Sequence, residues 1–268
     1  MPLLQIVFLV GVVMLAAAPV PVAAQTPPYG DRVSRGRDVT PAYEGYRRNP
    51  DGTYTMYFGY MNRNYEEELD IPVGPDNHVD PGGDRGQPTH FYPRRNSFLF
   101  TVVVPKDWGL ERKVVWTLTM RGKTNQARGW LQPEWEINDE IVMMNSGGGA
   151  DLENKPPVIT GAGSQSVTLP NAVALTATAQ DDGRPKRQRV TLDPEAVGAA
   201  AQGVSVRWIH YRGPAGVRFG PGASASGYDK PVTAATRASF KAPGVYVLRA
   251  VASDGSLEAF HDVTVTVK

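Results

Sequence analysis

The sequence contains no cysteine, so its 268 residues cannot form a disulfide, a thiolate nucleophile, or a cysteine-ligated zinc or iron–sulfur site. It also lacks an excess of either charge, because 28 basic and 27 acidic residues leave a formal net charge of +1. Such a balance gives no general attraction for nucleic acid, and we expect no nucleic-acid partner. Long helical segments are excluded as well, since 28 glycines and 23 prolines interrupt the chain. A hydrophobic fraction of 41% is nevertheless enough for packed cores.

The first 24 residues have the pattern of a secretory signal peptide. An apolar run from Leu3 to Ala18 is broken only by Gln5, and small residues precede the bond between Ala24 and Gln25. The alternative is an uncleaved anchor, but the run falls short of the roughly 20 residues that span a membrane. We therefore expect cleavage before Gln25, a periplasmic or secreted protein of bacterial origin, and no transmembrane segment in the mature chain.

Strand-like alternation dominates the first half. Residues 25–40 are rich in proline, glycine and charge and predict an extended lead-in. Within residues 41–145, apolar side chains occupy every second position of four segments, which is the period of a half-buried strand. These segments are Tyr54–Tyr60, Leu69–Val73, Phe98–Val104 and Val114–Met120, with weaker candidates at Trp135, Ile137 and Ile141–Met144. The pattern predicts a β-sandwich domain of unknown type.

A glycine-rich segment separates this region from a second β domain. Residues 146–157 contain Gly147, Gly148 and Gly149, which cannot hold a regular element, and predict a linker. Short strands with turns between them then fill residues 158–268, which suggests an immunoglobulin-like sandwich. The one helix expected there is an alanine-rich insertion over Leu192–Gln202. The fold class is thus all-β, with two β-sandwich domains joined by a glycine-rich linker.

The second half resembles the immunoglobulin-like repeats of bacterial surface proteins, the PKD and cadherin-like group. The resemblance is carried by "NKPPVI", "ATAQDDG", "VRWIHYRGPAGVRF", "ASFKAPGVYVLRAVASDG" and "DVTVTVK". It implies that Trp208 is the core tryptophan of the sandwich. The "GDG" that follows this tryptophan in PKD repeats is replaced here by "HYRGPAGVRF". The first half, with "YRRNPDGTYTMYFGYMNRNYEEELDIPVGP" and "DRGQPTHFYPRR", resembles a module of uncharacterised exported bacterial proteins, and this implies no function.

Aromatic side chains are concentrated before the linker. Sixteen lie between Gln25 and Asn154, against seven in the second half. Aromatic residues that do not belong to the inward-facing side of a predicted strand could stack on a sugar ring or contact a partner. The candidates for such contacts are Tyr43, Tyr57, Tyr92 and Trp130. The alternative is that these rings complete the core or an interface between the domains.

Two groups of polar residues suggest other chemistry. Glu66–Asp70 is rich in carboxylates, as glycoside hydrolysis requires, but nothing in the sequence distinguishes an acid from a nucleophile. A charged edge strand that resists aggregation is the better explanation of this segment. His78, Asp80, Asp84 and His90 share one loop but lack the short ligand spacing of a metal site.

Calcium is the one cofactor for which we expect a possible site from the sequence. This hard cation prefers six to eight oxygen ligands, and acidic residues cluster near the linker and in the turns of the second half. The candidate ligands are Asp151, Glu153, Asp181, Asp182 and Asp254. Simple turns capped by aspartate would explain the same residues without any ion.

These observations favour an exported, non-catalytic protein with a binding, adhesive or scaffolding role at the bacterial cell envelope. Its expected partner is an envelope protein or a polysaccharide. The alternative function is a carbohydrate-binding accessory protein that uses the aromatic residues of the first domain, and a third is a glycoside hydrolase. No phosphate-binding loop, nucleophile elbow or dinucleotide fingerprint occurs in the sequence.

Overall fold

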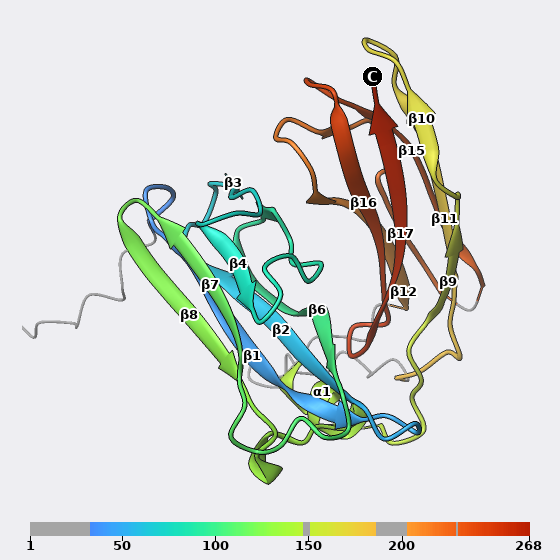
Figure 1. The fold of residues 1–268 in the computed structure, drawn as a ribbon. Coiled ribbons are helices and arrows are strands. Elements are labelled where there is room, and N and C mark those ends of the chain that lie inside the picture. The colour runs from blue at the N-terminus through green and yellow to red at the C-terminus, as the bar shows by residue number, and fades with distance from the viewer. Residues whose placement is uncertain (1–32, 147–150, 186–202, 229) are drawn as a thin grey trace, which may run out of the picture. The chain divides into compact units, whose positions relative to one another are not determined.

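The computed structural model describes residues 33–146, 151–185, 203–228 and 230–268. Within this part of the chain, residues 33–268 form one compact unit that is almost entirely β (Figure 1). The predicted signal peptide, the glycines of the linker and the helix expected over Leu192–Gln202 lie outside the described residues. Among the residues that are described, no helix has both the length and the apolar character needed to cross a membrane.

The first half forms two three-stranded sheets and one short strand pair. The sheets have the orders β1-β2-β6 and β4-β7-β8, and β3 pairs with β5. The strands are β1 (Val39–Arg48), β2 (Tyr54–Asn62), β3 (Leu69–Asp70), β4 (Asn77–Asp80), β5 (His90–Phe91), β6 (Arg94–Val104), β7 (Val114–Met120) and β8 (Lys123–Gly129). Strand β1 begins inside the segment predicted as a lead-in, because Val39 is already buried in the core.

The apolar residues at alternate positions of the predicted strands form the core of this half. Met56, Phe58 and Tyr60 of β2 are buried, and Phe58 stacks on Phe100 of β6 with ring centroids 5.3 Å apart. Trp116 of β7 is fully buried and meets Phe100 edge-on at 4.8 Å. These rings come from both three-stranded sheets, so one aromatic core joins the two layers.

Two details of the first half differ from the expectation. Phe98 does not join the alternating face of β6, because the β2–β6 register shifts between Phe58 and Tyr60 and Phe98 itself has a φ of 53°. Ile141–Met144, expected as a strand, lie instead in helix α1 (Asp139–Asn145), after the short 3₁₀ helix η1 (Pro133–Trp135). Asn138 caps α1 by accepting a hydrogen bond from the Ile141 amide at 2.9 Å, and this cap favours a helix over a strand.

The second half is an immunoglobulin-like sandwich. Its sheets have the orders β13-β15-β11-β9 and β10-β17-β16-β12-β14, which match the two sheets of that fold. The strands are β9 (Val158–Gly161), β10 (Gln165–Val167), β11 (Val173–Gln180), β12 (Val204–Arg212), β13 (Arg218–Phe219), β14 (Ser224–Gly227), β15 (Val232–Ser239), β16 (Gly244–Ser253) and β17 (Glu258–Val267). Trp208 of β12 is buried between the sheets with 4% of its surface exposed, where the resemblance places it.

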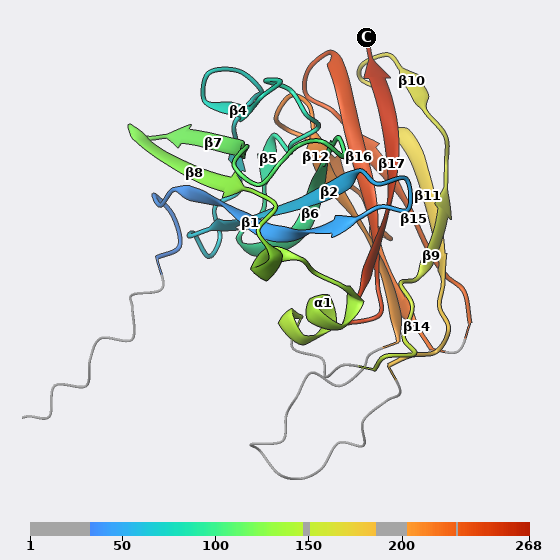
Figure 2. The ribbon, with the colours of Figure 1, turned by 60° about the horizontal axis from the view of Figure 1, so that its bottom comes forward.

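The five-stranded sheet of this sandwich is buried on both faces at its centre. Ile209, Tyr211 and Val251 point away from the sandwich core and belong to the aromatic core of the first half. Strand β5 lies beside β12 (Figure 2), and the Thr89 amide donates to the Tyr211 carbonyl at 3.1 Å. The two halves thus share a core in residues 33–268, and the domain bounds of 41–145 and 158–268 stay a prediction.

Candidate functional site

A cluster of two histidines and an aspartate lies where the two halves meet. His90 of β5 sits opposite Asp70 of β3 in the strand register, and its Nδ1 lies 2.8 Å from the Asp70 Oδ1. The other ring nitrogen, Nε2, lies 3.2 Å from the Glu68 Oε2. Each nitrogen of His90 therefore faces a carboxylate, while the ring is buried against Tyr92 at 4.6 Å.

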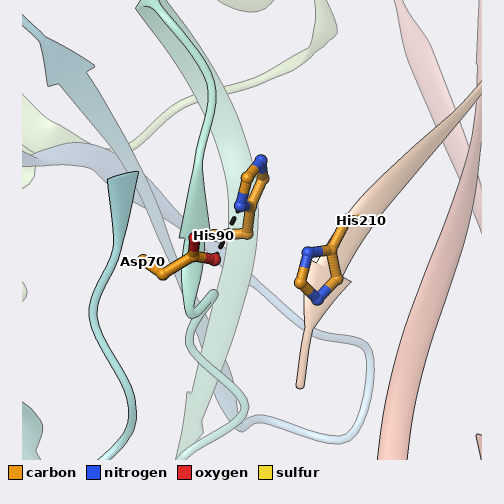
Figure 3. A group of neighbouring side chains, drawn as sticks. All are labelled: Asp70, His90 and His210. Atoms are coloured by element: carbon orange, nitrogen blue, oxygen red, sulfur yellow. Dashed lines mark hydrogen bonds and ion pairs between the residues drawn. The ribbon is translucent and has the colours of Figure 1, made fainter. Parts of the chain in front are cut away.

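The third member, His210, comes from β12 of the second half (Figure 3). Its ring stacks on that of His90 with centroids 4.8 Å apart and an interplanar angle of 29°. Its backbone amide donates to the Tyr92 hydroxyl at 2.9 Å. The His210 Nε2 is buried and has no hydrogen-bond partner, and only 3% of the residue is exposed. Burial, followed by the neighbouring His90, lowers the pKa of His210 to about 4, so this ring is neutral near pH 7.

One nitrogen or oxygen from each of Asp70, His90 and His210 lies within 4.8 Å of the others. Among the described residues, no other group of three or more His, Asp or Glu side chains meets this distance. The sequence had grouped His90 with His78, Asp80 and Asp84. His78 instead lies near Asp80, with its Nε2 3.8 Å from the Asp80 Oδ2, and its Nδ1 donates to the Pro75 carbonyl at 3.0 Å.

Sequence reasoning assigned no functional role to His210. The signal that could have found it is the unbroken run Trp208–Tyr211, because a strand buried on both faces loses its alternation. A histidine within such a run is buried on whichever face it points to.

The predicted calcium ligands divide into two groups. Asp151 and Glu153 both bind Arg184, whose Nη1 lies 3.0 and 2.9 Å from the two Asp151 carboxylate oxygens and whose Nη2 donates to Glu153. The guanidinium therefore offsets one of the two negative charges, and calcium binding by these two residues stays a prediction.

Two of the other three predicted ligands, Asp182 and Asp254, contact Lys155 and Asn154. The Asn154 Nδ2 donates to the Asp254 Oδ2 at 3.0 Å, and the Lys155 amide donates to the Asp182 Oδ2 at 3.1 Å. Two oxygens, the Asn154 Oδ1 and the Asp181 Oδ1, are buried with no hydrogen-bond partner. Burial raises the pKa of Asp181 and of Asp254, and the negative charge of Asp254 raises that of Asp181 further. Unpaired buried oxygens beside repelling carboxylates are a feature of sites for hard cations, but these three aspartates do not come together as closely as Asp70, His90 and His210 do. Calcium binding here stays a prediction.

Tyr43 and Trp130, two of the candidate contact residues, lie in one aromatic group with Trp135. Tyr43 stacks on Trp130 at 6.1 Å and donates from its hydroxyl to the Trp130 carbonyl at 2.9 Å. Trp135 lies 5.3 Å from Tyr43 and 5.9 Å from Trp130, and 37% of it is exposed. Tyr43 and Trp130 are themselves half-buried.

Tyr57 and Tyr92, the other two candidates, lie elsewhere. Tyr57 packs on Phe98 and lines a cavity of about 390 Å³ formed by both halves. Tyr92 sits at the histidine cluster, where burial raises the pKa of its hydroxyl to about 12. The structure therefore does not bring the four candidates into one surface, and their role in binding remains a prediction.

The 390 Å³ cavity combines rings with three arginines, and it is large enough for a small ligand. Each arginine already has a carboxylate partner: Asp139 at 2.6 Å from Arg47, Glu44 at 2.7 Å from Arg95, and Glu258 at 3.8 Å from Arg207. The cavity consequently offers little uncompensated positive charge.

The carboxylates of Glu66–Asp70 have different partners. Glu67 pairs with Arg121 at 2.7 Å and accepts from the Gly36 amide, also at 2.7 Å. Glu68 and Asp70 flank His90. Only Leu69–Asp70 forms a strand here, so the extended edge strand expected for this segment is reduced to two residues.

No family model matches the sequence, and no curated protein matches it. Solved structures that match include the eight N-terminal immunoglobulin domains of Down syndrome cell adhesion molecule, at 10% identity and a TM-score of 0.27 over 86% of this chain. This chain spans 27% of that one. A chimeric titin Z1Z2 matches at 10% identity and a TM-score of 0.23, covering 87% of this chain and 99% of the titin chain. The assignment of an immunoglobulin-like sandwich rests on the strand order itself.

Proposed function

We propose that the chain is an exported, non-catalytic binding or scaffolding protein of the bacterial cell envelope, with a PKD- or cadherin-like second half. The observation that carries the proposal is the doubly covered sheet, that is, the five-stranded sheet β10-β17-β16-β12-β14 whose centre is buried on both faces. Because residues of both halves pack on it, the two β modules form one unit. A scaffold must hold its binding surfaces at a fixed separation, and a shared core provides this better than a flexible linker.

Polar contacts reinforce the shared core. Arg249 of β16 is 7% exposed, binds both oxygens of Asp262 at 2.7 and 2.8 Å, and donates to the Leu99 carbonyl of β6. Its guanidinium also lies 3.6 Å from the centre of the Tyr211 ring. Tyr211 donates in turn to the Gly86 carbonyl at 2.5 Å. The contacts therefore run from the second half to two separate segments of the first.

Fractionation of cells that express the full chain tests export and envelope association together. We expect a product that begins at Gln25, located in the periplasm or medium, that co-sediments with purified envelope fragments. A cytoplasmic product that retains residues 1–24 would refute export. Hydrolysis of envelope polysaccharide that Glu68→Gln abolishes would instead support an enzyme.

A second candidate function, carbohydrate binding, is favoured by the aromatic group of Tyr43, Trp130 and Trp135. Flat rings present an apolar face on which the C–H face of a pyranose can pack, and the exposed part of Trp135 makes one ring available. The same rings would serve equally well as a cover for the core, since Tyr43 packs on the buried Phe58 at 5.4 Å.

A polysaccharide array separates these two roles. Under the binding hypothesis, Trp135→Ala abolishes retention of one glycan class and lowers the melting temperature little. The control is Tyr65→Ala, another exposed ring, 41% exposed and away from the group, which should leave binding intact. If the mature chain binds no envelope or plant polysaccharide, the carbohydrate hypothesis fails and a protein partner remains.

A further inference from the structure

We propose that Asp70, His90 and His210 bind one zinc ion, or a similar divalent transition metal ion, that ties the first half of the chain to the second. The proposal does not depend on the proposed function. It concerns residues from three strands, β3, β5 and β12. None of the sites predicted from the sequence contains all three of these residues.

The types of ligand favour this class of metal. Zinc binds imidazole nitrogen and carboxylate oxygen, and catalytic zinc sites commonly have three protein ligands with a fourth position for water. Calcium and magnesium prefer oxygen alone, so two histidines argue against them.

The second observation is the unsatisfied nitrogen of His210. A buried ring nitrogen without a partner is costly to the folded chain, and its Nε2 has none. A metal ion binds the lone pair of an unprotonated ring nitrogen, which this buried Nε2 can supply. A bound ion would therefore remove an existing penalty rather than add one.

The carboxylates of Asp70 and Glu68 would have different roles in the site. Asp70 faces His90 Nδ1 at 2.8 Å and is placed to bind the ion together with that nitrogen. Glu68 faces the opposite nitrogen at 3.2 Å, where it can accept a hydrogen bond from Nε2. A carboxylate on the second nitrogen of a metal-bound histidine orients the ring and raises its basicity.

Binding requires a small local movement. Metal–ligand distances of about 2.1 Å in a tetrahedron put ligand atoms about 3.4 Å apart, whereas the three groups here meet within 4.8 Å. The stacked rings also direct their in-plane lone pairs side by side, so one imidazole must turn about its Cβ–Cγ bond. Such a turn changes no backbone position.

Isothermal titration of the mature chain without a histidine tag, with Zn²⁺ alone, tests the site. We expect one ion per chain, and at least about tenfold weaker binding after His90→Gln, His210→Gln or Asp70→Asn. Visible absorption of bound Co²⁺ should show a tetrahedral spectrum that the same substitutions remove. Zn²⁺ should raise the melting temperature of the unsubstituted chain only.

The matched control is His78→Gln, because His78 also lies beside an aspartate but outside the cluster. It should bind Zn²⁺ like the unsubstituted chain. The proposal is overturned if the unsubstituted chain binds no more tightly than a His90→Gln, His210→Gln double variant, or if His78→Gln weakens binding as much as His90→Gln does. Should His210→Gln fail to fold, Asp70→Asn decides, because the Asp70 side chain is one-third exposed and its loss leaves no cavity.

Discussion

Replacement of Arg249 by alanine should destabilise the whole compact unit, and its cost can be worked out from the contacts. The guanidinium donates to the buried Leu99 carbonyl, which would lose this donor on substitution. An unsatisfied buried carbonyl costs about 1–3 kcal/mol. Loss of the cation–π contact with Tyr211 adds about 0.5–2 kcal/mol.

The ion pair itself contributes less to this sum. The Asp262 side chain is 41% exposed, so after the substitution water can solvate its carboxylate. We therefore expect Arg249→Ala to lower the free energy of unfolding by about 3 kcal/mol, and Asp262→Asn by less than about 1 kcal/mol.

Urea unfolding of the mature chain, followed by tryptophan fluorescence and by circular dichroism, measures both values. Because Arg249 lies at the junction, its loss should also separate the two signals, which the unsubstituted chain should show as one transition. A loss below about 1 kcal/mol with coincident transitions would refute the argument that the junction stabilises both halves.

Three further predictions follow from buried groups. Trp208→Ala should cost about 3–5 kcal/mol in urea unfolding, because its indole fills the sandwich core, and a loss below 1 kcal/mol would place the ring at the surface. His210 binds protons more weakly in the folded chain than in the unfolded one, so about 3 kcal/mol of stability present above pH 6.5 should be lost as the pH falls to about 4. A His210→Gln variant should lack this loss, and an unchanged pH profile would contradict the assignment. Ionised Asp181 is destabilising without a cation, since its pKa is raised. Asp181→Asn should therefore raise the melting temperature in chelator at pH 7 and abolish any rise that Ca²⁺ gives the unsubstituted chain.

Much of the fold was predictable because apolar residues at every second position indicate a strand in a sheet with one buried face. Met56, Phe58 and Tyr60 occupy every second position of β2 and are all buried, as the alternation predicted. The place of Trp208 in the sandwich core was predicted from the resemblance to immunoglobulin-like repeats. Helix α1 was mistaken for a strand because four apolar residues in a row fit either element. The cap at Asn138 and the two acidic residues after it were the local signs of a helix.

The candidate sites were less predictable because they depend on which segments meet. Asp151 and Glu153 are predicted calcium ligands, and the structure adds a contact that the sequence did not indicate, because Arg184, which binds both, is more than thirty positions away. His90 and His210 are separated by 120 positions, and no local pattern links β5 to β12. The sequence shows which possible ligand side chains the protein has. Which of them lie together depends on how the two halves pack.

The doubly covered sheet also bears on how this chain could have evolved. A domain that is exchanged between proteins as an independent unit needs an outer surface without a large apolar patch. Here Ile209, Tyr211 and Val251 would become exposed if residues 151–268 were moved into another protein, and together they would form an adhesive apolar patch. Selection should therefore transmit the two halves as a single heritable block, and a recombinant that receives only the second would tend to aggregate.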